Sequence, residues 1–335
     1  MATGLLIAGI LIGVAGFYVA TTYQTKVVTQ TKTVTQTETT TARPTATATV
    51  TVTPLKCGSV ITTDTTLNAN IGPCSGDGLV IDASHVVLNC AGHSISGINT
   101  NREISNGISL VGINLTGMSE VTVKDCYVME FLDGFYLTGS SGNTLTGNAA
   151  NYDTWSGFTL VGSSGNTLTN NTADNNTVVG FYLSHSSDNT LSVNMANDNK
   201  DCGFDLDGSS NNTLTGNTAT NNSLTGFVLL DSSSKNNLSG NTANNNDWGF
   251  DLDGSSNDTL TMNTASSNGV DGFYLYGSSG NTLPGNTANN NLDYGYYDSS
   301  TGTGTAGTAN FYTGDVCSGN GVGGSSPSGL GSPQS

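Results

Sequence analysis

The sequence predicts an all-β solenoid, in which short strands wind into coils and successive coils stack into parallel sheets. Gly-aromatic dipeptides recur from Gly134 to Gly295 with seven consecutive intervals of 23 residues. Each unit, such as GFYLTGSSGNTLTGNAANYDTWS, contains short alternating runs separated by Gly, Ser and Asn turns. None of these runs is long enough for a three-turn helix. The repeat therefore predicts regular coils over residues 131–300 and less regular N-terminal coils over residues 55–130, about ten coils in total.

The composition is acidic and poor in charge of either sign. The 335 residues include 44 glycines, only 10% are charged, and the net charge is −17. Nucleic acid is excluded as a partner, because the chain has no basic surface that could displace counterions from phosphates. Residues 131–300 contain sixteen Asp but only Lys200 and Lys235 as basic residues. The acidity thus belongs to the regular coils.

The N-terminal 54 residues differ from the repeat. Residues 1–23 are uncharged and largely apolar, which predicts a membrane segment. An uncleaved anchor is favoured over an export signal, because a basic n-region and a good cleavage site are missing. Residues 24–54 continue into a Thr-rich stalk that cannot bury a core. Anchor, stalk and cysteines together predict an extracellular, cell-surface protein.

The six cysteines lack a paired C-x-x-C, which argues against a zinc cluster. We expect disulfides between Cys57 and Cys74 and between Cys90 and Cys126, whereas Cys202 and Cys317 are too far apart along the repeat to pair without a fold-back. Seven N-x-Ser/Thr sequons are candidate glycosylation sites, although an Asn- and Thr-rich repeat also produces sequons by chance. The sequon asparagines are Asn114, Asn170, Asn175, Asn211, Asn221, Asn237 and Asn257.

Four apolar rows are expected to fill the interior of the regular coils, because equivalent residues of neighbouring coils lie one strand spacing apart. The aromatic row comprises Phe135, Phe158, Phe181, Phe204, Phe227, Phe250, Phe273 and Tyr296. A Leu row follows two residues later, and a second Leu row and an Ala row follow further along each unit. An Asn row that begins at Asn148 predicts a structural ladder of side-chain amides at a corner.

Residues 301–335 are rich in Gly and Ser and are expected to form a flexible tail. An open solenoid end exposes unpaired strand edges, so self-association through the ends is a further expectation.

The segments CGSVITTDTTLNANIGPC, GLVIDASHVVLNCAGHSISG and GFDLDGSSNNTLTGNTATNN give the chain a family resemblance. Over roughly residues 57–300 the sequence resembles right-handed parallel β-helix proteins of the NosD-like, carbohydrate-binding and sugar-hydrolase (CASH) type, whose architecture is related to pectin-lyase-like folds. The resemblance implies a right-handed parallel β-helix and a function connected with carbohydrate. A copper-linked function finds no support, because the three His are scattered and the five Met form no cluster.

The residues that alternate with the inward Phe and Leu should point outward. Their rows vary between Tyr and Asp, and this combination suits carbohydrate, because aromatic faces cover apolar sugar faces while carboxylates accept hydrogen bonds from hydroxyls. The predicted polysaccharide- or glycan-binding residues are Tyr136, Tyr182, Asp205, Asp207, Asp251, Asp253, Tyr274 and Tyr276. Trp155 and Trp248, just before their coil glycines, could extend this surface. Calcium could bridge Asp205 and Asp207 to a substrate.

The sequence is also compatible with other functions. Asp205 and Asp251 would lie two coils apart, about 9.6 Å, which approaches the carboxylate separation of inverting glycosidases. They are weak catalytic candidates for a polysaccharide hydrolase, because the face offers no Lys or Arg. A structural component of the cell envelope is the second alternative. Ice binding is a weaker one, based on the paired Thr rows that flank the second Leu row, because flat Thr-x-Thr arrays occur in ice-binding β-helices.

Overall fold

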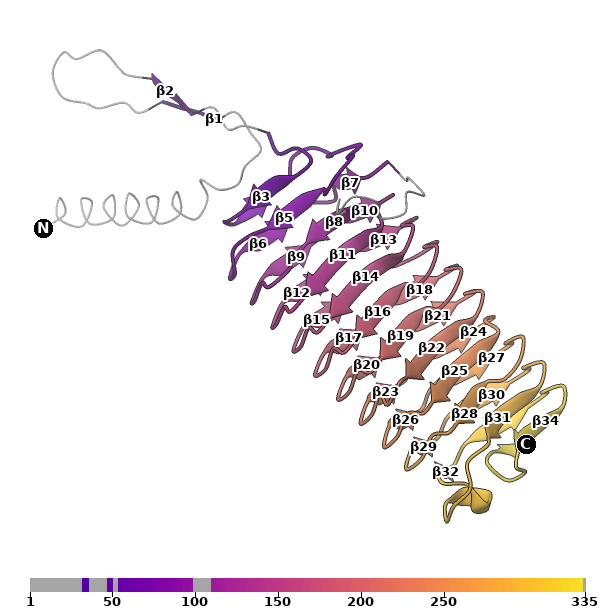
Figure 1. Ribbon diagram of the computed structural model, residues 1–335. Coiled ribbons are helices and arrows are strands. Elements are labelled where there is room, and N and C mark those ends of the chain that lie inside the picture. Colours follow the sequence, from indigo (N-terminus) through magenta and orange to yellow (C-terminus); the bar gives the residue numbers. More distant parts are fainter. Residues whose placement is uncertain (1–31, 36–46, 51–53, 99–109, 334–335) are drawn as a thin grey trace, which may run out of the picture.

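The computed structural model describes residues 32–35, 47–50, 54–98 and 110–333, and it confirms an all-β, right-handed parallel β-helix of about ten coils (Figure 1). Each complete coil contributes a strand to each of three faces, except that Ile71 and Thr172 form only isolated bridges on the third face. Strands of successive coils pair in parallel, so the faces run along the whole length of the solenoid.

The first face is a twelve-stranded sheet and carries the predicted binding residues. Its strands are β3 (Ser59–Ile61), β5 (Leu79–Ile81), β8 (Val111–Asn114), β11 (Asp133–Thr138), β14 (Ser156–Val161), β16 (Phe181–Ser184), β19 (Phe204–Asp207), β22 (Thr225–Leu230), β25 (Trp248–Asp253), β28 (Phe273–Tyr276), β31 (Tyr294–Asp298) and β34 (Gly323–Ser326).

The second face is an eleven-stranded sheet. Its strands are β4 (Thr65–Thr66), β6 (Val87–Asn89), β9 (Thr122–Lys124), β12 (Thr144–Thr146), β15 (Thr167–Thr169), β17 (Thr190–Ser192), β20 (Thr213–Thr215), β23 (Asn237–Ser239), β26 (Thr259–Thr261), β29 (Thr282–Pro284) and β32 (Phe311–Thr313).

The third face consists of two sheets, which Thr172 connects through isolated bridges to Ala149 and Met195. Its strands are β7 (Ser94–Ser96), β10 (Tyr127–Met129), β13 (Ala149–Asn151), β18 (Met195–Asn197), β21 (Thr218–Thr220), β24 (Thr242–Asn244), β27 (Thr264–Ser266), β30 (Thr287–Asn289), β33 (Val316–Ser318) and β35 (Ser332–Pro333).

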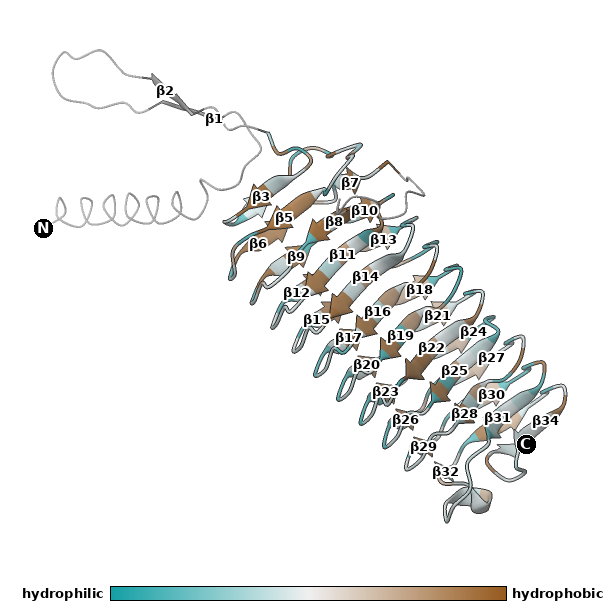
Figure 2. Ribbon diagram, in the orientation of Figure 1, coloured by the Kyte–Doolittle hydropathy of each residue, from teal (hydrophilic) through white to brown (hydrophobic). Residues whose placement is uncertain are grey.

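The predicted aromatic row is a continuous stack inside the solenoid. Neighbouring rings from Phe135 to Tyr296 have centroids 4.6 to 5.0 Å apart, and every one of them is fully buried. This spacing matches the strand spacing of a sheet, so the register of the coils places each ring directly on its predecessor. Figure 2 shows hydrophobic residues along the strands and hydrophilic residues at the corners. The predicted Leu and Ala rows complete this core.

The glycine that opens each regular coil is required by close packing. A Cβ added at Gly203 would lie 2.7 Å from the Ala219 Cβ and 2.7 Å from the carbonyl oxygen of Gly226. The Ala row and the glycine row therefore fit together, because the missing side chain leaves room for the methyl group and for the next strand.

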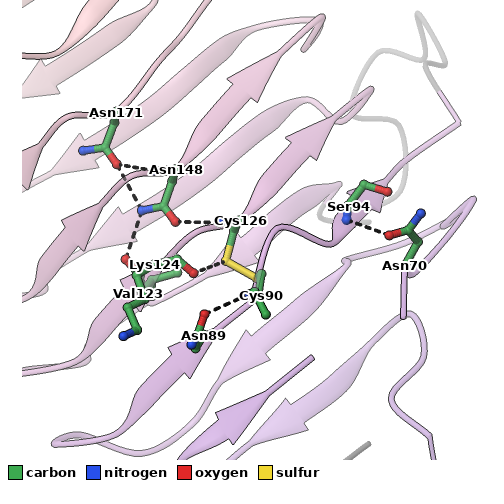
Figure 3. The surroundings of a disulfide bond; sticks show 10 residues. Asn70, Asn89, Cys90, Ser94, Val123, Lys124, Cys126, Asn148 and Asn171 are labelled. Carbon is green, nitrogen blue, oxygen red and sulfur yellow. Dashed lines mark hydrogen bonds between the residues drawn. A yellow bond between two sulfur atoms is a disulfide. The ribbon is translucent and has the colours of Figure 1, made fainter. Parts of the chain in front are cut away.

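The polar corners are satisfied by buried side-chain ladders. Asn148 Nδ2 donates to the carbonyl of Val123 and to Asn171 Oδ1, each at 3.0 Å, and the pattern continues from coil to coil (Figure 3). This confirms the predicted structural role of the Asn row. Two further Asn ladders, beginning at Asn143 and at Asp153, and a Ser ladder beginning at Ser140 were not predicted. They satisfy corner backbone groups that would otherwise be buried without partners.

One coil contains an extra residue, and the corner absorbs it. The ladder interval is 24 residues from Asn212 to Asn236 and 22 residues from Asn236 to Asp258, instead of 23. The insertion coincides with Asp231 and Ser232, which both adopt positive φ angles. The flanking strands stay in register, with Leu214 opposite Leu238 and Leu238 opposite Leu260.

Both predicted disulfides are present. Cys57 is bonded to Cys74 at the start of the N-terminal coils. Cys90 is bonded to Cys126 between successive N-terminal coils (Figure 3). Cys202 and Cys317 are free and buried.

The prediction of a flexible tail over residues 301–335 is wrong for most of that segment. Phe311–Thr313, Val316–Ser318, Gly323–Ser326 and Ser332–Pro333 are strands that continue the solenoid, and the short 3₁₀ helix η1 (Thr305–Gly307) lies in the loop before them. Hydrogen bonds between the ladders span 29 residues here, so this coil is longer than the others.

The predicted membrane segment, residues 1–23, lies outside the described residues. The described part of the chain contains no helix with the length and apolar character needed to cross a membrane. Within the predicted stalk, β1 (Lys32–Thr35) and β2 (Thr47–Val50) pair antiparallel.

Candidate functional site

The outer surface of the twelve-stranded sheet brings together all eight predicted binding residues. Along each strand the Phe and Leu face the core, and the residue after each of them faces out. The register places Asp205 opposite Val228, Val228 opposite Asp251, and Asp251 opposite Tyr274. The parallel row runs from Asp207 through Leu230 and Asp253 to Tyr276. We call this surface, from β11 to β31, the acidic–aromatic face.

An aromatic cluster occupies the C-terminal part of this face. The ring centroids of Tyr274 and Tyr297 are 5.1 Å apart, those of Tyr274 and Tyr276 are 6.4 Å apart, and Trp248 lies 6.5 Å from Tyr274. Tyr294 joins the cluster at 6.1 Å from Tyr297. Five aromatic side chains from three successive strands, β25, β28 and β31, thus lie together on the solvent side of the sheet.

The orientation of the rings limits which of them could cover a sugar. The planes of Tyr274 and Tyr297 differ by only 10°, so these two rings turn faces toward each other rather than outward. The ring of Tyr276 lies beside that of Tyr274, inclined by 7°, and Tyr276 is 54% exposed. Its partner on the preceding strand is the short side chain of Asp253. Tyr276 is therefore the tyrosine whose ring face is best placed for a ligand lying over Asp253.

Two carboxyl groups of the face have strongly perturbed acidity. Burial, together with the neighbouring carboxylates of Asp253 and Asp271, raises the pKa of Asp251 to about 7. Burial raises the pKa of Asp205 to about 7 as well, with further contributions from the carboxylates of Asp207, Asp201 and Asp231. At neutral pH each group is therefore divided between its neutral and its charged form. The neutral form can donate a hydrogen bond, whereas the charged form accepts hydrogen bonds and attracts cations.

Hydrogen bonding on the face is incomplete. The Tyr182 hydroxyl donates to Asp207 Oδ2 at 3.2 Å. Asp205 Oδ1, Asp251 Oδ1 and Trp248 Nε1 are buried in the structure without a hydrogen-bond partner. Buried polar atoms normally have partners, so this concentration of unpaired atoms distinguishes the face from the corners, where the ladders satisfy most polar groups.

The geometry gives little support to catalysis by Asp205 and Asp251. Between the two side chains lies Val228, which is 5% exposed and packs with Val179 and Cys202 in a small apolar cluster. In the described segments from residue 54 onward there is one ion pair, His85 with Glu120, which belongs to the N-terminal coils. The two carboxyl groups thus face a common apolar strip with no basic side chain paired to either of them.

Several residues of the face were missed by the sequence analysis. Asp271 and Tyr294 occupy the position directly before a coil glycine, as Trp248 does, and the strands begin at or near that position. Tyr297 continues the outward row of Tyr274, as the alternation predicts, but it was not included among the predicted binding residues; it stacks on Tyr274. The sequence does indicate that this position faces outward, because the residue before the glycine varies among Asp, Ser, Val, Cys, Thr, Trp and Tyr as freely as the residues of the outward rows do.

A preformed metal site was not found in the part of the chain that the structure describes. No group of three or more His, Cys, Asp or Glu side chains there is arranged to hold a metal ion. The bridging calcium considered for Asp205 and Asp207 therefore has no complete protein ligand set among these residues.

The sequons lie mostly away from the acidic–aromatic face. Six of the seven asparagines are exposed, and five of these six adopt positive φ angles at turns. Asn114 is the exception, because it lies in β8 and its Oδ1 accepts hydrogen bonds from the amide and hydroxyl of Thr116. Glycosylation of any of them stays a prediction.

Comparison with known proteins places this architecture in a family. Residues 111–260 and 230–312 match the family model described as "Right handed beta helix region". The chain belongs to this right-handed β-helix family. This confirms the predicted architecture, and no curated protein matches the sequence.

Solved structures share the fold at low sequence identity. The family member described here is similar to the Dettilon tailspike protein gp208 (TM-score 0.60, 17% identity, covering 78% of this chain and 58% of the tailspike chain). It is also similar to the A-module of the Azotobacter vinelandii mannuronan C-5 epimerase AlgE6 (TM-score 0.55, 17% identity, 85% and 80% covered) and to the pectate lyase Pel9A (TM-score 0.53, 19% identity, 81% and 77% covered). The pectin-lyase-like architecture is thereby supported, and the identities show the fold alone.

Proposed function

We propose that this β-helix protein binds a polysaccharide or glycan along its acidic–aromatic face. The observation that carries the proposal is the cluster of Trp248, Tyr274 and Tyr276 beside the carboxyl groups of Asp251 and Asp253 on one solvent-facing surface. Two of the structural neighbours bear the names of a mannuronan epimerase and a pectate lyase, which is consistent with a carbohydrate ligand.

The chemistry of the face suits sugar hydroxyls and apolar sugar surfaces. The exposed ring of Tyr276 can pack against the C–H face of a sugar. Asp253 next to it accepts hydrogen bonds from hydroxyls, and a neutral Asp251 can donate one. The unpaired Trp248 Nε1 adds a donor that a local side-chain movement would make available to an oxygen. Binding would thus combine one aromatic contact with several polar ones in a small area.

We further propose that the protein acts outside the cell, anchored through residues 1–23. The two disulfides are typical of oxidising compartments, and the exposed sequons lie where attached glycans would leave the acidic–aromatic face uncovered. Protease protection and fractionation of the full chain in its native membranes would test the anchor.

A glycan array probed with the full-length protein tests the binding function. Once a binding glycan is identified, Tyr276→Ala should weaken its affinity for the protein about tenfold, because roughly one aromatic contact is lost. Tyr127→Ala is a matched control, because Tyr127 is 51% exposed but lies in β10 on the third face. Equal losses in the two variants, or an array without any signal, would contradict the proposal. Filament formation together with a silent array would favour the structural role instead.

A further inference from the structure

The acidic–aromatic face contains the same acidic motif twice, at an interval of two coils. The segments DCGFDLDGSS (residues 201–210) and DWGFDLDGSS (residues 247–256) each supply three aspartates. The first triplet is Asp201, Asp205 and Asp207, and the second is Asp247, Asp251 and Asp253. Since β19 and β25 are separated by β22 alone, equivalent carboxyl groups are about two strand spacings, or roughly 9.6 Å, apart.

The negative charge of these triplets is not compensated by the protein. Asp205 is close enough to Asp201, Asp207 and Asp231 for all three to raise its pKa, and Asp253 and Asp271 act on Asp251 in the same way. Of the basic residues in the regular coils, Lys200 and Lys235 are both exposed at corners. The described structure forms no ion pair between either lysine and these aspartates. Each additional negative charge on this face therefore costs energy, and each positive charge brought by a ligand would be stabilised.

Three buried atoms without hydrogen-bond partners lie on the strands that carry these triplets. Asp205 Oδ1 and Asp251 Oδ1 are equivalent atoms of the two triplets, and both lack hydrogen-bond partners. Trp248 Nε1, from the strand of the second triplet, is also unpaired. The spacing of the triplets is close to the length of a disaccharide in an extended polysaccharide, so alternate sugars of one chain could meet equivalent aspartates.

From this geometry we infer that the glycan is a polymer of amino sugars, bound along the solenoid axis so that alternate residues place their ammonium groups at the two aspartate triplets. The inference rests on the glycan-binding function proposed above and adds the chemical class of the ligand. A polyuronate would bring further carboxylates against Asp205 and Asp251 and should be rejected. Tyr276 then contacts a sugar ring beyond the second triplet, where the carboxylate rows give way to tyrosines.

Three soluble hexasaccharides test the inference at near-neutral pH by calorimetry with the full-length protein. β-1,4-linked glucosamine, β-1,4-linked N-acetylglucosamine and oligogalacturonate are cationic, neutral and anionic, and the first two share a backbone. We expect the glucosamine hexamer to bind about tenfold more tightly than its acetylated counterpart at low salt, with the ratio shrinking at high salt. The galacturonate hexamer should not bind.

Variants separate the role of charge from that of the aromatic contact. The double substitution Asp251→Asn with Asp253→Asn should reduce the preference for the cationic hexamer several-fold, whereas Tyr276→Ala should weaken both β-1,4 hexamers and leave their ratio unchanged. Asp188→Asn with Asp198→Asn, at two exposed corners, removes the same number of charges and controls for net charge.

A ratio near one, tighter binding of the neutral or anionic hexamer, or an unchanged ratio in the double variant would overturn the inference while leaving glycan binding intact. If no hexamer binds, the inference fails. The array then decides the wider proposal, because another glycan class would keep the binding function and a silent array would remove it.

Discussion

Asp258 interrupts a ladder of amides with a carboxyl group, and its replacement by Asn should stabilise the protein in a strongly pH-dependent manner. In the neighbouring rungs, Asn236 Nδ2 donates to the carbonyl of Ser209 and Asn281 Nδ2 donates to that of Ser255. Asp258 is 1% exposed, and its Oδ1 accepts hydrogen bonds from the backbone and side chain of Asn236. Its Oδ2 has no partner. Only a proton on Oδ2 lets this oxygen act as the donor that the ladder requires.

The magnitude follows from the acidity of the group. Burial raises the pKa of Asp258 from 3.8 to about 7, against the opposing effect of the hydrogen bonds from Asn236. Between about pH 4 and pH 7 the folded state holds a proton that the unfolded state has released, so the free energy of unfolding falls as the pH rises. The difference in pKa corresponds to about 4 kcal/mol of stability, which is fully present below pH 4 and fully lost above pH 7.

Urea denaturation of the parent and of Asp258→Asn between pH 4 and pH 8 measures this effect. The variant should be more stable by up to about 4 kcal/mol at pH 8 and nearly equal to the parent at pH 4. Asp188→Asn is the control, because Asp188 is exposed at the same kind of corner, next to the ladder residue Asn189. A stability difference that does not change with pH, or a variant less stable than the parent at pH 8, would refute the reasoning.

Three further changes test the packing of the coils by the same denaturation measurement. Gly203→Ala should destabilise the protein by about 1 to 3 kcal/mol, since the new methyl group meets backbone of the next strand, whereas Gly76→Ala has open space and should be nearly neutral. Phe204→Ala should cost about 3 to 5 kcal/mol, because it opens a cavity in the middle of a continuous ring stack; a smaller loss would mean that the stack closes over the gap. Val193→Asn should stabilise the protein by about 1 kcal/mol, because Val193 is 58% exposed with a φ of 55° at a corner where every other regular coil except that of Met262 has Gly or Asn. A loss of stability would give the valine a packing role.

The sequence predicts most of the fold because each coil repeats the same packing solution. The Phe row, the Leu rows and the Asn row beginning at Asn148 can be found from the 23-residue interval alone. The last coil could not be predicted, since it spans 29 residues and replaces the usual ladder Asn by Asp315, the core Leu by Tyr312 and the core Ala by Cys317. With both the interval and the residue types changed, the repeat has no visible continuation.

The candidate site is predictable only in part. Alternation along the strands correctly places Asp205, Asp251 and Tyr276 on one outer surface. It does not predict that Tyr274 and Tyr297 stack face to face, because ring orientation depends on contacts between coils. The acidity of Asp205 and Asp251 is likewise set by how deeply their neighbours cover them, and no pattern of residues gives that depth.

The extra residue at Asp231 and Ser232 shows that a corner can change length while the strands on both sides keep their pairing. Such a molecule can grow or shrink by whole units without redesigning its interior. Duplication of one coil between the two aspartate triplets would move them apart by a fixed step, and deletion would bring them together. Unequal recombination between near-identical units would thus change the distance between the binding positions in steps of one coil, without changing the packing inside each coil.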